Sequence, residues 1–343
     1  MHRFGPPGEF ELCPLAGASF GGQLRSVNAT DAKSVIAVME SEPDILPRAL
    51  HAADGLLLFK DLHEVSTEPS LMLRLSQLLG PAVDNYRQTG TPAYMVHESV
   101  PEIYVVSNAP PVNRWPPPPP DPPLCPDGTL PVTFPHRRGW HTDQSFRRPP
   151  PDISLLYGVQ VAIKGQGQTL FADCAAAFDA LPASVQAQIE DLVGVHVEYG
   201  ANRSEDDVRN RRPVRPLKKH ERPQSQPVVR IHPVTGRRAL YLCDGAQMDW
   251  VDGPIAGLGT GPGSDGAKLL YKLMAHLTQR RFVYVHEWDR GDMVIFDNRN
   301  VVHAVTWYDA ENYQRTLWRT TVSGNPGREY DGQQPSWLPD SDE

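Results

Sequence analysis

Two short segments, far apart in the chain, carry side chains that could hold a metal ion. Residues 140–143 read Trp-His-Thr-Asp, and residues 297–303 read Asp-Asn-Arg-Asn-Val-Val-His. They offer the imidazoles of His141 and His303 and the carboxylate of Asp143. Two histidines and one carboxylate on one face of a metal leave other coordination positions open, which is the ligand set of non-haem iron(II) oxygenases. The residues therefore predict chemistry with dioxygen at a ferrous ion.

The His-x-Asp pattern alone is a weak signal. With 12 histidines and 41 acidic residues, roughly one His-x-acid match is expected by chance, and residues 196–198, His-Val-Glu, are a second one. Side chains two positions apart in a strand point to the same face, so we expect a strand that turns His141 and Asp143 inward and Thr142 away. We interpret His196 and Glu198 as a structural pair or a solvated strand edge, because no further motif surrounds them.

The composition is that of a globular protein with an acidic balance. Of the 343 residues, 40% are hydrophobic and 22% are charged, and the formal net charge is −8. A general nucleic-acid binder would normally carry a basic excess, so we expect no nucleic-acid partner. The length suits one domain over residues 1–343, because closed or sandwiched β architectures often exceed about 200 residues around a single core.

The cysteines and the apolar segments bear on the cellular compartment. Cys13, Cys125, Cys174 and Cys243 are scattered without a Cys-x-x-Cys pair, which argues against a structural zinc site or a disulfide scaffold and favours a reducing compartment. The first residues lack the apolar stretch of a secretion signal, and no run of about 18 apolar residues could cross a bilayer. We therefore expect a cytoplasmic protein without a membrane partner, and self-association into a homo-oligomer stays open.

Short strands with turn residues between them dominate the pattern, interrupted by a few helices. This favours a mainly β protein with flanking helices (α+β), whose core is a double-stranded β-helix or jelly roll of the cupin kind, rather than alternating βαβ units. Helices are expected at 30–40, with Thr30 as the cap, at 71–79, at 175–192, as one or two helices broken at Pro182, and at 269–278. Strands are expected at 55–60, 103–106, 153–161, 169–172, 228–230, 239–242, 282–287, 293–296, 302–307 and 316–322.

Three segments stand apart from these elements. Residues 109–137 are a proline-rich insertion that forbids regular ladders, and it is either a lid over the site or a surface decoration. Residues 203–222 are rich in arginine and lysine and poor in apolar residues, so we expect an exposed basic loop, with an anion-recruiting flap as the alternative. Residues 324–343 are expected to form a C-terminal tail.

Several further motifs accompany the candidate metal ligands in a fixed order. These are Thr-Leu-Phe-Ala-Asp at 169–173, Phe-Asp-Asn-Arg at 296–299, and Arg315 and Arg319 after His303. With residues 140–143 they resemble the taurine dioxygenase/TfdA (TauD/TfdA) family of iron(II)- and 2-oxoglutarate-dependent oxygenases. The resemblance covers a core of about residues 10–323, and it extends to Gly-Leu-Leu-Leu-Phe at 55–59, Leu-Gly-Pro at 79–81 and His-Pro-Val-Thr-Gly-Arg at 232–237.

The resemblance implies a role for each of these residues. His141, Asp143 and His303 would be the iron ligands and the catalytic centre, Thr169 would offer its hydroxyl to 2-oxoglutarate, and Arg315 would clamp the distal carboxylate of that cosubstrate. Physical chemistry agrees, because arginine presents a planar, two-pronged donor that matches a carboxylate. The usual Gly-Gly-Asp-Thr turn of the family reads Gln-Gly-Gln-Thr at 166–169 here, which keeps Thr169 but alters the turn.

Other positively charged residues bear on the substrate. Arg319 lies four positions after Arg315, about 13 Å along a strand at roughly 3.3 Å per residue, so the two cannot share one carboxylate. The resemblance implies that Arg319 lies nearer the metal, where it would meet the other end of the cosubstrate or an anionic primary substrate. Arg137 and Phe146 flank the first ligand, where such enzymes shape the substrate pocket.

The expected function is hydroxylation of a small, acidic organic substrate with iron(II), 2-oxoglutarate and dioxygen, releasing succinate and carbon dioxide. Sulfonates, aryloxyalkanoates and amino-acid or natural-product acids are all compatible with the residues. Two alternatives remain: desaturation or cyclisation in natural-product biosynthesis at the same site, and a non-enzymatic jelly-roll protein that binds metal and 2-oxoglutarate. A halogenase is disfavoured, because Asp143 fills the coordination position that a halide would need.

Overall fold

The computed structural model of the protein describes residues 2–5, 9–117 and 139–337. It is a mixed α+β structure, as the sequence predicts. A large sheet follows the order β1 (His2–Phe4), β2 (Phe10–Pro14), β3 (Gly22–Ser26), β4 (Leu56–Phe59), β14 (Met293–Asp297), β7 (Ile153–Gln160), β16 (Thr316–Ser323) and β5 (Ala82–Val83). Strand β6 (Tyr104–Ser107) also pairs with β16, and all described pairs of this sheet are antiparallel except β3 with β4.

A smaller sheet carries the second part of the candidate site. It consists of β13 (Val283–His286), β8 (Thr169–Asp173) and β15 (Val301–Val305), with β8 in the centre and both pairings antiparallel. Two hairpin-like pairs accompany it, β9 (Val193–His196) with β10 (Gln224–Pro227), and β11 (Val229–Ile231) with β12 (Arg238–Leu240). The strands that hold the predicted site residues therefore come from two different sheets.

A layer of apolar side chains joins the two sheets. Phe296 of β14 and Leu156 of β7 belong to the same buried cluster as Phe171 of β8 and Val301 of β15. The rings of Phe171 and Phe296 lie 5.4 Å apart between centroids, within the range of favourable aromatic pairs. The two sheets therefore pack face to face through this cluster.

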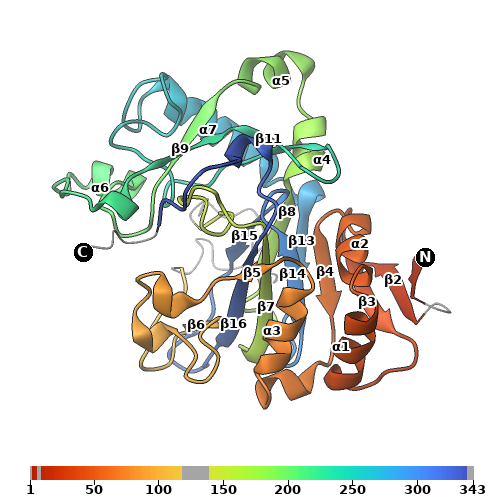
Figure 1. Ribbon diagram of the computed structural model, residues 1–343. Helices are drawn as coiled ribbons and strands as arrows, with labels where there is room; N and C mark the ends of the chain where they lie inside the picture. Colours follow the sequence, from red (N-terminus) through yellow and green to blue (C-terminus); the bar gives the residue numbers. More distant parts are fainter. Residues whose placement is uncertain (1, 6–8, 118–138, 338–343) are drawn as a thin grey trace.

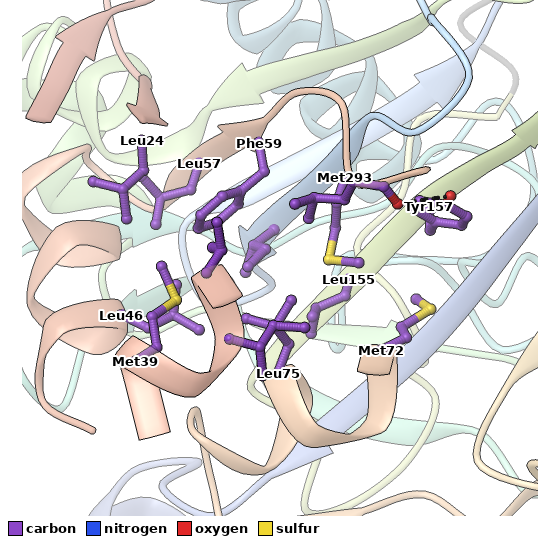
Figure 2. Close-up of a cluster of buried hydrophobic side chains, with 14 of the residues drawn as sticks. Leu24, Met39, Leu46, Leu57, Phe59, Met72, Leu75, Leu155, Tyr157 and Met293 are labelled. Carbon is purple, nitrogen blue, oxygen red and sulfur yellow. Dashed lines mark hydrogen bonds between the residues drawn. The ribbon is translucent and has the colours of Figure 1, made fainter. Parts of the chain in front are cut away.

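Three helices cover the other face of the large sheet. They are α1 (Ala32–Ser41), α2 (Ile45–Ala52) and α3 (Ser70–Gln77), which Figure 1 shows grouped beside that sheet. Figure 2 shows Met39, Leu46 and Leu75 of these helices pointing at Leu57 and Leu155 of the strands. Because β7 and β14 are covered on both faces, β14 and the first six residues of β7 are buried without the alternation of a half-exposed strand.

A second group of helices covers the small sheet. Helices α4 (Cys174–Asp179), α5 (Ala183–Ile189) and α7 (Asp265–Leu277) lie together in Figure 1, and α4 and α7 share a buried cluster with Leu170 of β8 and Val302 of β15. The short helix α6 (Glu205–Arg209) lies beyond them. The described 3-10 helices are η1 (His63–Ser66), η2 (Tyr86–Gln88), η3 (Ala93–Met95), η4 (Lys219–Glu221), η5 (Arg280–Phe282) and η6 (Arg328–Tyr330).

The structure corrects two helix predictions. The cap of α1 is Asp31, whose carboxylate accepts the amide of Ser34, and not Thr30. Helix α2 was not predicted. Its Pro47 lies in the first turn, where a proline is tolerated because the amide that it lacks has no partner there. The expected break at Pro182 is confirmed, since α4 and α5 are separate helices.

Residues 203–222 are not wholly the exposed basic loop that we expected. Arg203 is buried, and two of its guanidinium nitrogens donate to Asp249 at 3.0 and 2.7 Å. A further part of the segment forms α6, which begins with a capping box at Ser204 and Asp207. Charge count alone missed this, because an arginine can be buried where a carboxylate neutralises it. Of the proline-rich insertion, residues 118–137 lie outside the described residues.

The C-terminal segment 324–337 packs against the body of the protein. Tyr330 is buried, and the guanidinium of Arg230 lies 5.2 Å from the centre of its ring. The same guanidinium also donates to the carbonyl of Pro326. The predicted tail is thus part of the packed structure as far as residue 337. None of the helices in the described ranges has the length and apolarity needed to cross a membrane.

The rival histidine pattern does not gather metal ligands within the described residues. His196 is fully buried at the end of β9, its Nδ1 lies 2.8 Å from the Ser145 hydroxyl, and Glu198 is exposed. Burial lowers the pKa of His196 to about 3. Its imidazole is therefore neutral in the folded protein, which agrees with a structural role.

Truncation of a core side chain tests the packing between the large sheet and its helices. Leu155→Ala removes a fully buried side chain of β7, and we expect it to lower the free energy of unfolding by about 2–5 kcal/mol. Urea unfolding followed by circular dichroism measures the change. Ile163→Ala, at an exposed side chain, is the control and should stay within about 0.5 kcal/mol of the parent.

The buried His196 predicts a pH dependence of stability. Below pH 6.5 the unfolded chain binds a proton at this residue, whereas the folded chain does not until pH about 3, so stability falls with pH across this window. His196→Asn should therefore show a shallower fall between pH 6 and pH 4, by at most about 1.4 kcal/mol per pH unit. Equal slopes for the parent and the variant in urea titrations would contradict the prediction, whatever constant offset the substitution adds.

Candidate metal centre

The three predicted ligands meet at the edge of the small sheet. The candidate ligand atoms of His141, Asp143 and His303 all lie within 4.8 Å of one another. His303 is the middle residue of β15, and His141 pairs with it as an isolated antiparallel bridge. In this bridge each amide donates to the other carbonyl, at 2.9 and 2.8 Å, and the two rings lie 4.2 Å apart between centroids. Backbone pairing thus brings the two distant histidines together.

Asp143 reaches the group by a different route from the one predicted. Only His141 is paired as in a strand; the chain then turns, and Gln144 has a positive φ of 52°. The expectation of a strand through Asp143 is therefore wrong, but the side chains still converge, with His141 Nε2 3.7 Å from Asp143 Oδ1. Thr142 points away, as expected, and donates to the carbonyl of Asn298 at 2.8 Å.

A small polar network fixes the carboxylate of Asp143. The hydroxyl of Ser154 donates to its Oδ2 at 2.7 Å, and the backbone amide of Asp143 donates to the side-chain oxygen of Asn298. The side-chain nitrogen of Asn298 in turn donates to Ser154. Sequence reasoning did not single out Ser154 or Asn298, although Asn298 belongs to the quoted 296–299 motif. The network holds one oxygen and leaves Oδ1 facing the histidines.

Both histidines are in the form that can bind a metal. Nδ1 of His141 lies 2.6 Å from the carbonyl of Gly139 and must carry the proton of that hydrogen bond, so the lone pair of Nε2 is free. Burial lowers the pKa of His141, and burial together with the neighbouring His141 ring lowers the pKa of His303 to about 3. Neutral imidazoles are the ligands that metals require.

Arg319 pairs with the candidate ligand Asp143. Its Nη1 lies 2.5 Å from Asp143 Oδ1, and both side chains are shielded from solvent. Burial alone would raise the pKa of Asp143, but the charge of Arg319 and the two histidines hold it below its usual range. The carboxylate is therefore ionised, as a metal ligand must be. Much of the charge of Arg319 is compensated by this ion pair.

Arg315 lies deeper and contacts Thr169. Its Nε donates to the carbonyl of Gly167 at 3.0 Å, and its Nη2 lies 3.3 Å from the Thr169 hydroxyl oxygen. Trp288, which sequence reasoning missed, donates its indole N–H to the same hydroxyl at 2.9 Å. Two donors thus occupy the acceptor capacity of the Thr169 oxygen, which leaves its own proton available for an anion.

Arg315 differs from the other buried arginines of the described residues. Arg147, Arg203, Arg230 and Arg299 each have a carboxylate within 4.0 Å, whereas Arg315 has none. Burial lowers its pKa to about 10, which expresses the cost of holding this charge without a counter-ion. The arrangement of Arg315 and Thr169 therefore suits an anionic ligand.

A second His/His/Asp group in the described residues is already saturated. His51, His232 and Asp297 have ligand atoms within 4.8 Å of one another. Nδ1 of His232 accepts the amides of Val234 and Thr235, so its Nε2 carries the proton that is donated to Asp297 at 2.9 Å. No lone pair of His232 remains for a metal. The group instead anchors Asp297, which also accepts two hydrogen bonds from Arg299.

The predicted roles of the remaining site residues in binding substrate or cosubstrate stay predictions. Arg137 is outside the described residues, so its predicted role in substrate binding stays a prediction. Phe146 is partly exposed, three positions after Asp143, and its predicted contact with substrate also stays a prediction. The roles of Thr169, Arg315 and Arg319 toward a cosubstrate have the same standing.

Comparison with known proteins places the chain in a family. A 2,4-dichlorophenoxyacetate dioxygenase from Cupriavidus pinatubonensis, described as alpha-ketoglutarate-dependent, is 37% identical over 190 residues, which are 53% of this chain and 59% of that protein. A pentalenolactone F synthase from Streptomyces arenae is 29% identical over 192 residues, 54% of this chain and 61% of that protein. The chain thus matches less than two thirds of the length of these relatives.

Solved structures and a family model extend the likeness to most of the chain. The crystal structure of AAD-2 in complex with Mn(II) and N-oxalylglycine superimposes with a TM-score of 0.65 at 26% identity, covering 92% of this chain and 98% of that one. The model of the family "Taurine catabolism dioxygenase TauD, TfdA family" matches residues 37–321. The chain belongs to the TauD/TfdA family.

Proposed function

We propose that this protein is an iron(II)- and 2-oxoglutarate-dependent dioxygenase that hydroxylates a small, anionic organic substrate and releases succinate and carbon dioxide. The observation that carries the proposal is the convergence of two neutral imidazoles and one ionised carboxylate beside a buried arginine that lacks a counter-ion. The buried charge of Arg315 is unfavourable without an anion, and the three donor side chains suit a metal ion. Together they match a ferrous ion and a dicarboxylate.

The donor set fits iron(II). His141, Asp143 and His303 are the three candidate ligands of the group, and no fourth His, Cys, Asp or Glu of the described residues joins it. Three protein donors leave room for a chelating cosubstrate and for dioxygen. When bound, iron(II), 2-oxoglutarate and dioxygen supply the oxidising power, which no amino-acid side chain could provide.

The chain's own residues would orient the cosubstrate and exclude water. Arg315 would form a charge-assisted pair with the distal carboxylate of 2-oxoglutarate, and Thr169 would donate its free hydroxyl proton to the same group. Phe171 and Phe296 lie 6.0 and 4.7 Å from the ring of His303 between centroids, and they give the site an apolar wall. An apolar wall that excludes water strengthens the ion pairs inside the site, because the local dielectric constant is low.

Arg319 is better placed to orient the carboxylate of Asp143 than to bind a cosubstrate or substrate. Its contact with Asp143 Oδ1 means that a cosubstrate or substrate would have to compete with a shielded ion pair. We further propose that the facing sheets form the two halves of a jelly roll. The identity with a 2,4-dichlorophenoxyacetate dioxygenase supports an organic acid as the primary substrate.

One alternative outcome at the same site has a specific observation in its favour. The relative from Streptomyces arenae is named a pentalenolactone F synthase, and natural-product synthesis often needs desaturation or ring formation. All residues named above serve these outcomes equally. Product analysis by mass spectrometry distinguishes them, since hydroxylation adds one oxygen whereas desaturation removes two hydrogens. A non-enzymatic binder would release no succinate with any substrate.

Anaerobic spectroscopy tests the metal assignment. We expect iron(II) and 2-oxoglutarate to produce together a weak visible absorption band of the chelate, followed by succinate release when air is admitted. His141→Ala and His303→Ala should abolish the band, because each removes one of three donors. His63→Ala, which removes an exposed histidine elsewhere, is the matched control and should keep it. If both site variants behave like the parent, the assignment is wrong.

Arg315 offers a test that separates a ligand-binding role from a structural one. Arg315→Gln should raise the KM for 2-oxoglutarate by about tenfold to a hundredfold, the usual worth of a charged hydrogen bond. The ligand-free variant should lose little stability, because removing a buried charge that has no counter-ion offsets the loss of its hydrogen bonds to Gly167 and Thr169. Arg299→Gln, which breaks a buried pair, should instead cost about 3–5 kcal/mol. Thermal unfolding without ligand distinguishes the two arginines.

A further inference from the structure

Trp288 donates a hydrogen bond to the hydroxyl that the proposed function assigns to the cosubstrate. It lies two positions after β13, its side chain is buried, and its indole Nε1 donates to Oγ1 of Thr169 at 2.9 Å. Nη2 of Arg315 lies 3.3 Å from the same oxygen. The nitrogens of an indole and of a guanidinium group donate hydrogen bonds and accept none, so the Thr169 oxygen must be the acceptor in both contacts.

These two contacts determine where the proton of the Thr169 hydroxyl can point. A hydroxyl group has two lone pairs and one proton, and here a donor engages each lone pair. The side chain of Thr169 is buried in the central strand of the small sheet, and its hydroxyl donates to no acceptor among the residues that the structure describes. The proton therefore takes the one direction that remains, and a buried donor of this kind is costly until an acceptor binds there.

Packing fixes the orientation of the indole. The ring of His286 meets it edge-on, with centroids 4.4 Å apart. A methyl group on Gly158 of β7 would come within 3.1 Å of the Trp288 ring, so this strand has no side chain where the indole packs. The indole also belongs to the buried cluster that joins the two sheets. A side chain enclosed at this density cannot turn its N–H away from Thr169.

From these contacts we infer that Trp288 is a positioning residue for 2-oxoglutarate: its N–H fixes the rotation of the Thr169 hydroxyl, so that the hydroxyl proton is directed at the distal carboxylate. The inference rests on the proposed function. Without the indole N–H, one lone pair of Oγ1 is free and the hydroxyl can rotate. Binding of the carboxylate would then have to order this rotation, whereas in the parent protein it is set before the ligand arrives.

A double-mutant cycle tests the role of Trp288. The full-length protein is loaded anaerobically with iron(II), and 2-oxoglutarate is titrated by calorimetry. We expect Trp288→Phe to weaken the binding of 2-oxoglutarate by about threefold to tenfold, the net worth of one hydrogen bond. In a Thr169→Val background, which has no hydroxyl to orient, Trp288→Phe should weaken binding no further. An equal loss in both backgrounds would overturn the inference, because lost packing would then explain it.

Two further variants separate the hydrogen bond from the packing of the ring. Trp250→Phe makes the same substitution at a fully buried tryptophan whose N–H has no partner among the described residues, and it should bind 2-oxoglutarate like the parent. Replacement of Trp288 by 3-benzothienylalanine keeps the bicyclic shape and removes only the N–H. It should therefore fold even if Trp288→Phe does not, and it should show the same loss of affinity. Parent-like binding by this replacement would contradict the inference.

The outcomes also separate this inference from the proposed function. If the iron(II)-loaded parent does not bind 2-oxoglutarate, the proposed function fails, and the inference fails with it. If the parent binds 2-oxoglutarate but both changes at Trp288 leave the affinity unchanged, or if Thr169→Val binds as tightly as the parent, the proposed function stands and the role of Trp288 is wrong.

Discussion

The backbone bridge between His141 and His303 is the interaction on which the site depends. Its two hydrogen bonds, at 2.9 and 2.8 Å, tie the irregular segment that carries the first histidine to the edge of a rigid three-stranded sheet. Because main-chain geometry sets this contact, the two imidazoles meet whatever the side chains around them do. Asp143 then needs only a short turn, supported by Ser154 and Asn298, to complete the group.

Most buried charges of the described residues are compensated by an opposite charge. Buried arginines are expensive unless paired, and most of those in the described residues are neutralised by an acid. Asp297 is an example of a buried acid with a structural role, since its carboxylate accepts hydrogen bonds from both Arg299 and His232. Arg315 breaks this pattern within the described residues, because it is buried and has no carboxylate within 4.0 Å. A buried cation without a counter-ion is typical of a site that binds an anion.

The sequence predicts the elements well where a pattern repeats. The apolar runs of β7 and β14, the Gly-bearing turn before β8 and the break at Pro182 all follow from local chemistry. The sequence does not predict the local structure where contacts between distant segments determine it. Helix α2 contains a proline, Arg203 is buried by a carboxylate 46 positions away, and the turn at Gln144 leaves no mark in a His-x-Asp pattern. Trp288 and Ser154 carry no local signal, since only the pairing of the sheets brings them to the site.

The C-terminal segment contacts residues next to those that hold Asp143. Arg299 donates to the carbonyl of Asn325, and the amide of Asn325 donates to Asp152, just before β7. Arg299 directly follows Asn298, whose side-chain oxygen accepts the amide of Asp143. The last described residues therefore support the position of a candidate ligand that lies far from them in the sequence.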